Sequence, residues 1–202
     1  MPRKLFGPSK REIWRQLSQE VNGRFVEGGF FSQDKVEVRH GEWILTLDTY
    51  VVSTGKVTVI YTRMRAPYVN PGGFRFTIYR KGWATNIAKW LGMQDIEVGD
   101  SKFDEEFVIQ GTQPAQVVAL FSNSRLRESI SGLRQVHLSV KDDEGYFGIS
   151  FPEGVDELAY QVTGTIKDID QLKRLFDVFA ETLEHLCRMG LAYENDPGVQ
   201  VK

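Results

Sequence analysis

The sequence is poor in cysteine and contains no long apolar run. Cys187 is the only cysteine among 202 residues, which excludes an internal disulfide and the usual structural zinc sites, because zinc sites of that kind take two to four cysteines. No stretch approaches the roughly 18 apolar residues of a membrane span, and none resembles the apolar core of a signal peptide. We therefore expect a soluble protein in a reducing, cytoplasmic compartment.

Sequence patterns of common catalytic and phosphate-binding sites are also missing. The chain has no Gly-x-Gly-x-x-Gly and no Gly-x-x-x-x-Gly-Lys-Ser/Thr, and Ser150 lacks the second glycine of a nucleophile elbow. The three histidines, at 40, 137 and 185, show no metal-ligand spacing, and Cys187 lies on an apolar helical stripe. The sequence therefore predicts no catalytic residue, no metal site and no cofactor.

The composition is that of an ordinary globular protein. It is 41% hydrophobic and 26% charged, with a formal net charge of -2. A chain of this length buries roughly 70% of the surface exposed by its unfolded form, so it folds without a disulfide or a metal. We expect a single domain over 1–202, with two closely packed lobes of about 1–99 and 100–194 as the alternative, and an irregular tail over 195–202.

The first hundred residues are predicted to form a helix followed by an antiparallel meander. Residues 10–21 carry apolar side chains at helical spacing, and Ser9 with Glu12 has the pattern of a capping box. A turn is expected over 67–73, where Pro71 precedes two glycines. Segments rich in β-branched and aromatic residues predict strands at 43–52, 57–62 and 74–80.

The second half mixes helices and strands and ends in the longest helix. Apolar spacing over residues 169–187 gives one continuous stripe, and Gly190 is the expected helix end. This stripe could pack on its own sheet or on a second copy of the chain. Shorter helices are expected at 83–91, 114–121 and 125–130, and strands at 103–111, 136–140, 147–151 and 158–162. These patterns predict an α+β fold, a twisted, mainly antiparallel sheet with an N-terminal helix, middle helices and a long C-terminal helix packed on it.

The near-neutral net charge conceals an uneven distribution. Residues 49–94 contain seven Lys and Arg and no Asp or Glu, whereas the other 156 residues carry 18 basic and 27 acidic side chains. The basic segment also holds eight aromatic residues. Basic side chains interleaved with aromatic ones suit single-stranded nucleic acid or an anionic headgroup.

A hairpin between 57–65 and 74–80 would divide these cations into two groups. Arg63, Arg65 and Arg75 would gather near the turn beside Tyr68, roughly 23 Å from the other group. Arginine forks bind carboxylate or phosphate, so the candidate binding site is the anion cluster Arg63, Arg65, Tyr68 and Arg75. The alternative is that the cations pair with acidic surface elsewhere in the fold, such as Asp95–Glu106. The other group contains Lys56, Arg80 and Lys81.

The most recognisable segment is Glu97–Gly111, with the pattern Phe-Asp-x-x-Phe-x-Ile-x-Gly followed by Pro114 and a helix. Together with the Trp14 helix, the Trp43 strand and Thr62–Pro67, it resembles a family of bacterial proteins of unknown function over about residues 10–130. The resemblance implies a bacterial source and brings no activity or site residues.

The motif also has a structural interpretation. Phe103 and Phe107 would share one face of a strand, and Asp104 would accept backbone hydrogen bonds. Gly111 would allow a left-handed turn before the next helix.

The favoured function is a non-enzymatic binding or interaction module. One alternative is an anion-surface binder, for nucleic acid or acidic lipid, acting through the basic region. The other is a hydrolase or transferase whose site is assembled from distant residues, so whether the chain is an enzyme stays open. A protein partner or a homodimer is equally open.

Overall fold

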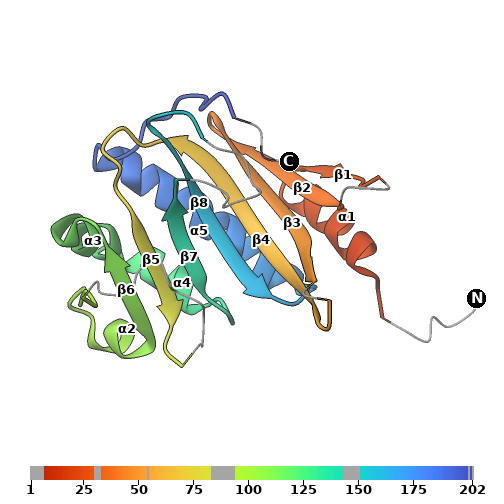
Figure 1. The fold of residues 1–202 in the computed structure, drawn as a ribbon, viewed down its shortest axis with the longest axis horizontal. Helices are drawn as coiled ribbons and strands as arrows, with labels where there is room; N and C mark the ends of the chain where they lie inside the picture. Colours follow the sequence, from red (N-terminus) through yellow and green to blue (C-terminus); the bar gives the residue numbers. More distant parts are fainter. Residues whose placement is uncertain are drawn as a thin grey trace, which may run out of the picture.

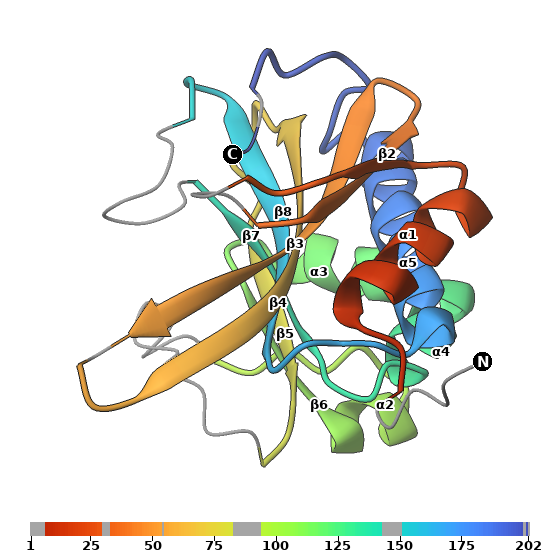
Figure 2. The same cartoon turned by 90° about the vertical axis from the view of Figure 1, so that its right-hand side faces the viewer.

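A computed structural model describes residues 7–29, 33–53, 55–82, 94–142, 151–199 and 201. It contains one antiparallel sheet of eight strands in the order β1-β2-β3-β4-β8-β7-β5-β6, with helices on one face (Figures 1 and 2). The predicted α+β class is confirmed. The strands are β1 (Arg24–Val26), β2 (Lys35–His40), β3 (Trp43–Ser53), β4 (Thr58–Val69), β5 (Phe76–Arg80), β6 (Phe107–Gly111), β7 (His137–Lys141) and β8 (Val155–Thr163). The helices are α1 (Lys10–Glu20), α2 (Ser101–Glu106), α3 (Pro114–Phe121), α4 (Ser124–Ser131) and α5 (Ile169–Arg188).

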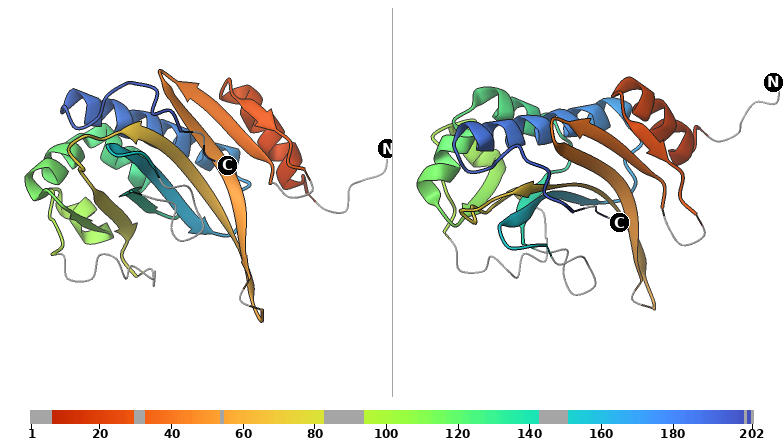
Figure 3. Two further views of the ribbon diagram at one scale, coloured as in Figure 1. Left: turned by 45° about the horizontal axis from the view of Figure 1, so that its top comes forward. Right: turned by 90° about the horizontal axis from the view of Figure 1, so that it is seen from above.

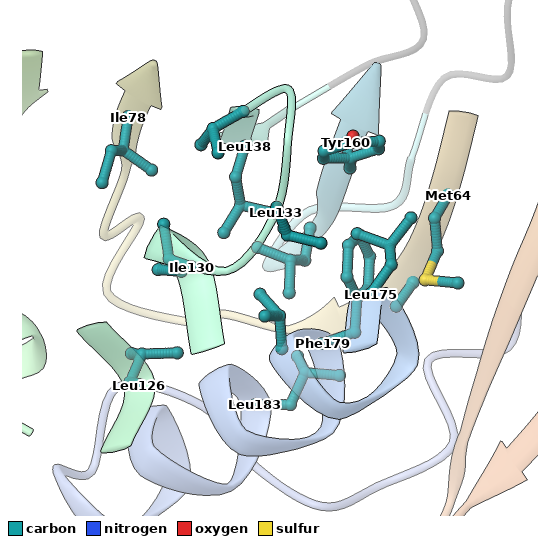
Figure 4. Close-up of a cluster of buried hydrophobic side chains, with 14 of the residues drawn as sticks. Met64, Ile78, Leu126, Ile130, Leu133, Leu138, Tyr160, Leu175, Phe179 and Leu183 are labelled. Atoms are coloured by element: carbon teal, nitrogen blue, oxygen red, sulfur yellow. The ribbon is translucent and has the colours of Figure 1, made fainter. Parts of the chain in front are cut away.

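Helix α5 supplies the centre of the core. Its N-cap Asp168 accepts from the N–H of Gln171, and Gly190, at φ 71°, ends it. The N–H groups of Gly190 and Leu191 return to the carbonyls of Cys187 and Leu186, which is the Schellman arrangement. The apolar stripe packs on the chain's own sheet, where Leu175, Phe179 and Leu183 lie with Met64, Leu138 and Tyr160 (Figure 4).

Helix α1 begins at the predicted capping box. The Ser9 hydroxyl accepts from the N–H of Glu12, and the Glu12 carboxylate accepts from the N–H of Ser9. Trp14 is fully buried and donates its indole N–H to the carbonyl of Ile166, 3.1 Å away. This bond ties α1 to the segment that leads into α5.

The predicted hairpin between 57–65 and 74–80 is wrong. Strand β4 pairs with β3 and with β8, whereas β5 pairs with β6 and β7. Strand β4 also runs through Pro67 to Val69, so the turn is confined to 70–73. The proline is tolerated because pairing with β3 ends at Arg65, so no ladder bond to β3 needs its missing N–H. Strand β8 then fills the place beside β4 that the sequence assigned to β5.

The predicted strand over 103–111 is correct only in its second part. Residues 101–106 form α2, because Asp100 caps it by accepting from the N–H of Phe103. Asp104 accepts from the N–H groups of Val98 and Gly99 at 2.9 and 3.0 Å, as expected.

Gly111 has a role different from the expected left-handed turn. Its φ is not positive, but an added Cβ would lie 2.6 Å from Cγ2 of Val117. Glycine is therefore needed for the close approach of α3 to β6. The helix expected at 83–91 and most of the strand expected at 147–151 lie outside the described residues.

No helix within the described ranges is both long enough and apolar enough to cross a membrane.

Candidate functional site

The sheet face turned away from the helices carries polar and charged side chains. Alternation along β3 and β4 places Leu47 and Met64 in the core and Asp48, Arg63 and Arg65 on this outer face. Strands β3 and β4 bend away from the helix layer (Figure 3). On the outer face Asp48, Arg65 and Glu157 are only 5%, 2% and 2% exposed. Charged groups buried to this degree are rare without partners.

Asp48 is the centre of this arrangement. Nε and Nη2 of Arg63 donate to its two carboxylate oxygens at 2.6 and 3.0 Å. Nη2 of Arg65 donates to Oδ2 at 2.7 Å. Register explains the geometry, since Asp48 lies opposite Arg63 and Thr46 lies opposite Arg65. One carboxylate on β3 therefore holds in place two guanidinium groups of the adjacent strand β4.

Aromatic rings flank the same arginine. The Arg63 guanidinium lies over the Tyr50 ring at 4.8 Å, and Tyr50 stacks on Tyr61 at 5.0 Å. Burial, reinforced by Tyr61, raises the pKa of Tyr50 to about 12. Its hydroxyl is therefore protonated at neutral pH and can donate a hydrogen bond.

Tyr50, Arg63 and Arg65 line a pocket of about 100 Å³ on the outer face. Strand register places Lys141 of β7 opposite Glu157 of β8 on its far wall. With Asp48 behind it, the pocket combines three cations with two carboxylates. We call it the arginine pocket and define it by Tyr50, Arg63, Arg65, Lys141, Glu157 and Gln161.

The other two residues of the predicted anion cluster lie elsewhere. Tyr68 is fully buried in the core, where burial raises the pKa of its hydroxyl well above the usual value. Arg75 contacts Asp142 at 2.8 Å and Asp156 at 3.4 Å. The structure therefore brings Arg63 and Arg65 together. It leaves Arg75 out because β5 is not the neighbour of β4, and it leaves Tyr68 out because Tyr68 shares the core face of β4 with Met64 and Ala66.

Two of the three cations in the second predicted group, Arg80 and Lys81, contact acceptors in the fold. Arg80 forms an ion pair with Glu106, inside the acidic stretch named as the alternative partner, and donates to the carbonyl of Leu133 at 2.7 Å. Lys81 donates to the carbonyl of Asp104 at 2.7 Å. These contacts explain Arg80 and Lys81 as structural.

The histidines and the cysteine do not form a reactive centre in the described ranges. Among those residues, no group of three His, Cys, Asp or Glu side chains is placed to hold a metal ion. His40 contacts Glu184 at 2.9 Å, and burial lowers the pKa of His137 to about 4. Burial also raises the pKa of the Cys187 thiol, which disfavours the reactive thiolate.

The sequence interpretation missed Asp48, Tyr50, Lys141 and Glu157 as site residues. Asp48 is the one acidic residue in the strand over 43–52, and alternation alone places it on the face opposite Leu45 and Leu47. That signal was available in the sequence. Strand order was needed to join it to β7 and β8.

Comparisons with family models, with curated proteins and with solved structures find no match to this chain. Any proposal on function therefore rests on the geometry of the chain itself.

Proposed function

We propose that this protein is a non-enzymatic binding protein that holds a small anionic ligand in the arginine pocket. The cationic lining of the pocket supports this proposal. Arg63, Arg65 and Lys141 line it together with Glu157, and Asp48 orients the two guanidinium groups. A carboxylate or phosphate on the ligand would form charge-assisted hydrogen bonds with these groups in a region where charges are poorly screened by solvent.

The pocket's size and surroundings favour a small ligand over a polymer. The cavity volume of about 100 Å³ is smaller than the roughly 300–1,000 Å³ of sites for drug-sized ligands, so the pocket suits a small anion. A nucleic acid or a lipid surface needs a broad area of uncompensated cations. Here Arg75 and Arg80 each contact a carboxylate away from the pocket, so they do not extend it into such an area.

The neighbouring groups suit recognition of an anion by hydrogen bonds. Tyr50 can donate its hydroxyl proton, and Gln161 offers both a donor and an acceptor. Asp48 of β3 fixes the two guanidinium groups of β4, so little side-chain entropy is lost when a ligand binds.

Binding of inorganic phosphate and of citrate tests the proposal. We expect one of these anions, added at constant ionic strength, to raise the Tm of the wild type and to give a saturable calorimetric titration. Loss of one charged hydrogen-bonding group costs about 1.5–3 kcal/mol, so Arg63→Gln should bind roughly 10–100-fold more weakly.

Arg75→Gln is the matched control, because it removes an arginine that also contacts carboxylates but lies outside the pocket. It should bind like the wild type. The proposal fails if neither anion binds the wild type, or if Arg63→Gln and Arg75→Gln lose the same affinity.

A further inference from the structure

Strands β3 and β4 extend beyond the rest of the sheet as a projecting two-stranded ribbon (Figure 2). Strand β2 pairs with β3 only over Trp43–Leu47, and β8 pairs with β4 only from Tyr61 onward. We define the β3–β4 ribbon as Val51–Ser53 and Thr58–Ile60, which pair with each other. An isolated two-stranded ribbon is at best marginally stable in water, so this one would gain from a partner.

The ribbon is apolar on both faces. Val51 and Ile60 lie opposite each other on one face and are 48% and 43% exposed, and Val52 on the other face is 39% exposed. Lys56, in the connecting turn, is the only charged residue between Thr49 and Thr62. Edge strands in native proteins usually carry charges or proline that prevent pairing with other chains. The edge of β3 has neither from Thr49 to Ser53.

The backbone of β3 presents hydrogen-bonding groups at this edge. The carbonyl of Ile60 accepts from the N–H of Gly164 at 2.7 Å, so the backbone groups of Ile60 point away from β3. When two residues lie directly opposite each other in an antiparallel pair, their backbone N–H and C=O groups either all point toward the other strand or all point away from it. The N–H and C=O of Val51 therefore point away from β4, to the side where the described chain places no strand. Two residues on, those of Ser53 point the same way.

A β-strand fits this edge better than a lipid surface or a flat protein face. Hydrocarbon would cover the valines but leave the backbone groups of Val51 and Ser53 without hydrogen bonds, at a cost of several kcal/mol each in a bilayer. Only an added strand satisfies the edge and covers the side chains together.

We propose that the added strand is β3 of a second copy of this chain, paired antiparallel about a two-fold axis at Val52, so that the outward backbone groups of Val51 in each copy meet those of Ser53 in the other. Antiparallel pairing of the two projecting ribbons places the two protein bodies at opposite ends of the paired segment. It also keeps the two Lys56 side chains apart and brings aliphatic side chains together on both faces. The two sheets then become one continuous sheet. The paired segment is short, so it buries less surface than stable interfaces of about 1,200 Å² or more. The dimer is therefore weak, and its population depends on protein concentration.

Sedimentation velocity of the full chain over a wide range of concentrations tests this proposal. The wild type should shift from the 23.1 kDa monomer toward twice that mass. Val51→Pro removes the outward N–H while keeping an apolar side chain, and the ribbon does not use that N–H. This variant should remain a monomer at every concentration.

Val51→Lys is a second variant, to be used if the proline variant fails to fold. It adds a charge at the same edge and should also remain a monomer.

Ile60→Thr is the matched control, because it removes an aliphatic group from the same face while leaving the β3 edge intact. It should still dimerise. The proposal is overturned if the wild type is a monomer at the highest concentration, or if folded Val51→Pro dimerises like the wild type. A monomeric wild type that cosediments with anionic phospholipid vesicles would also overturn it in favour of a lipid partner.

Discussion

The two faces of β4 differ in how they are stabilised. Toward the helices, Met64 and Ala66 are fully buried among apolar side chains. On the other face Arg63 and Arg65 are held by Asp48. Burial of apolar side chains contributes favourable free energy to folding. Removing charges from water costs about as much free energy as their pairing contributes. The inner face therefore contributes more to stability than the outer face.

The largest expected effect comes from the inner face. Phe179 is fully buried in the core, so Phe179→Ala removes contacts and leaves a cavity. We expect a loss of about 3–5 kcal/mol in the free energy of unfolding, measured by urea titration. Val118→Ala, at an exposed position of α3, should change it by less than about 0.5 kcal/mol. Similar losses in the two variants would contradict the assignment of the core.

The next effect tests the outer face. Asp48→Asn keeps the shape of the side chain but removes the negative charge that holds Arg63 and Arg65. We expect a loss of about 3 kcal/mol, because breaking a buried pair leaves charge uncompensated. Arg63 is the more exposed partner, so Asp48→Asn with Arg63→Gln should recover part of the loss. If the double variant shows only the sum of the two single losses, the pairing has no energetic role.

The third prediction concerns the pH dependence of stability, which is expected to include a contribution from His137. His137 lies on β7 with a pKa lowered to about 4 by burial, whereas the unfolded chain protonates this residue near pH 6.5. The unfolded state therefore binds the proton first, and stability falls as the pH drops through this window, by about 1 kcal/mol per unit. His137→Gln should be relatively more stable at pH 5 than at pH 7 when each is compared with the wild type. An identical difference at both pH values would contradict the assignment.

The smallest effect is expected at the solvent-facing contact between α1 and α5. Lys173 and Glu20 form an ion pair at 3.2 Å with both side chains substantially exposed. Water and salt screen such pairs, so Lys173→Ala should leave the urea midpoint unchanged within error. A clear destabilisation would show that the pair contributes to helix docking more than its exposure implies.

Local features could be predicted from the sequence with good accuracy. The Ser9 capping box, the start of α3 at Pro114 and the stripe of α5 with its Gly190 end all depend on residues within a few positions of one another. The α2 helix was missed because its short signal, the Asp100 cap, lies inside a run that also fits a strand.

The candidate site could be predicted only in part. Arg63 and Arg65 were identified from the charge distribution, and the structure places both in the arginine pocket. Arg75 was grouped with them because the assumed neighbour of β4 was wrong, and Tyr68 because it was assigned to a turn, whereas it belongs to β4 and faces the core. Side-chain alternation predicts which residues share a face of one strand, but it does not say which strand lies beside it.

The sequence by itself determined the fold class, the amphipathic helices and the side of each strand that faces the core, because periodicity and capping are local properties of the chain. Only the tertiary structure decided that β8 lies between β4 and β7, which brings Lys141 and Glu157 to the arginines. That choice depends on contacts between residues about 90 positions apart, where many pairings have similar local patterns. The packing of the whole core on α5 selects one of them.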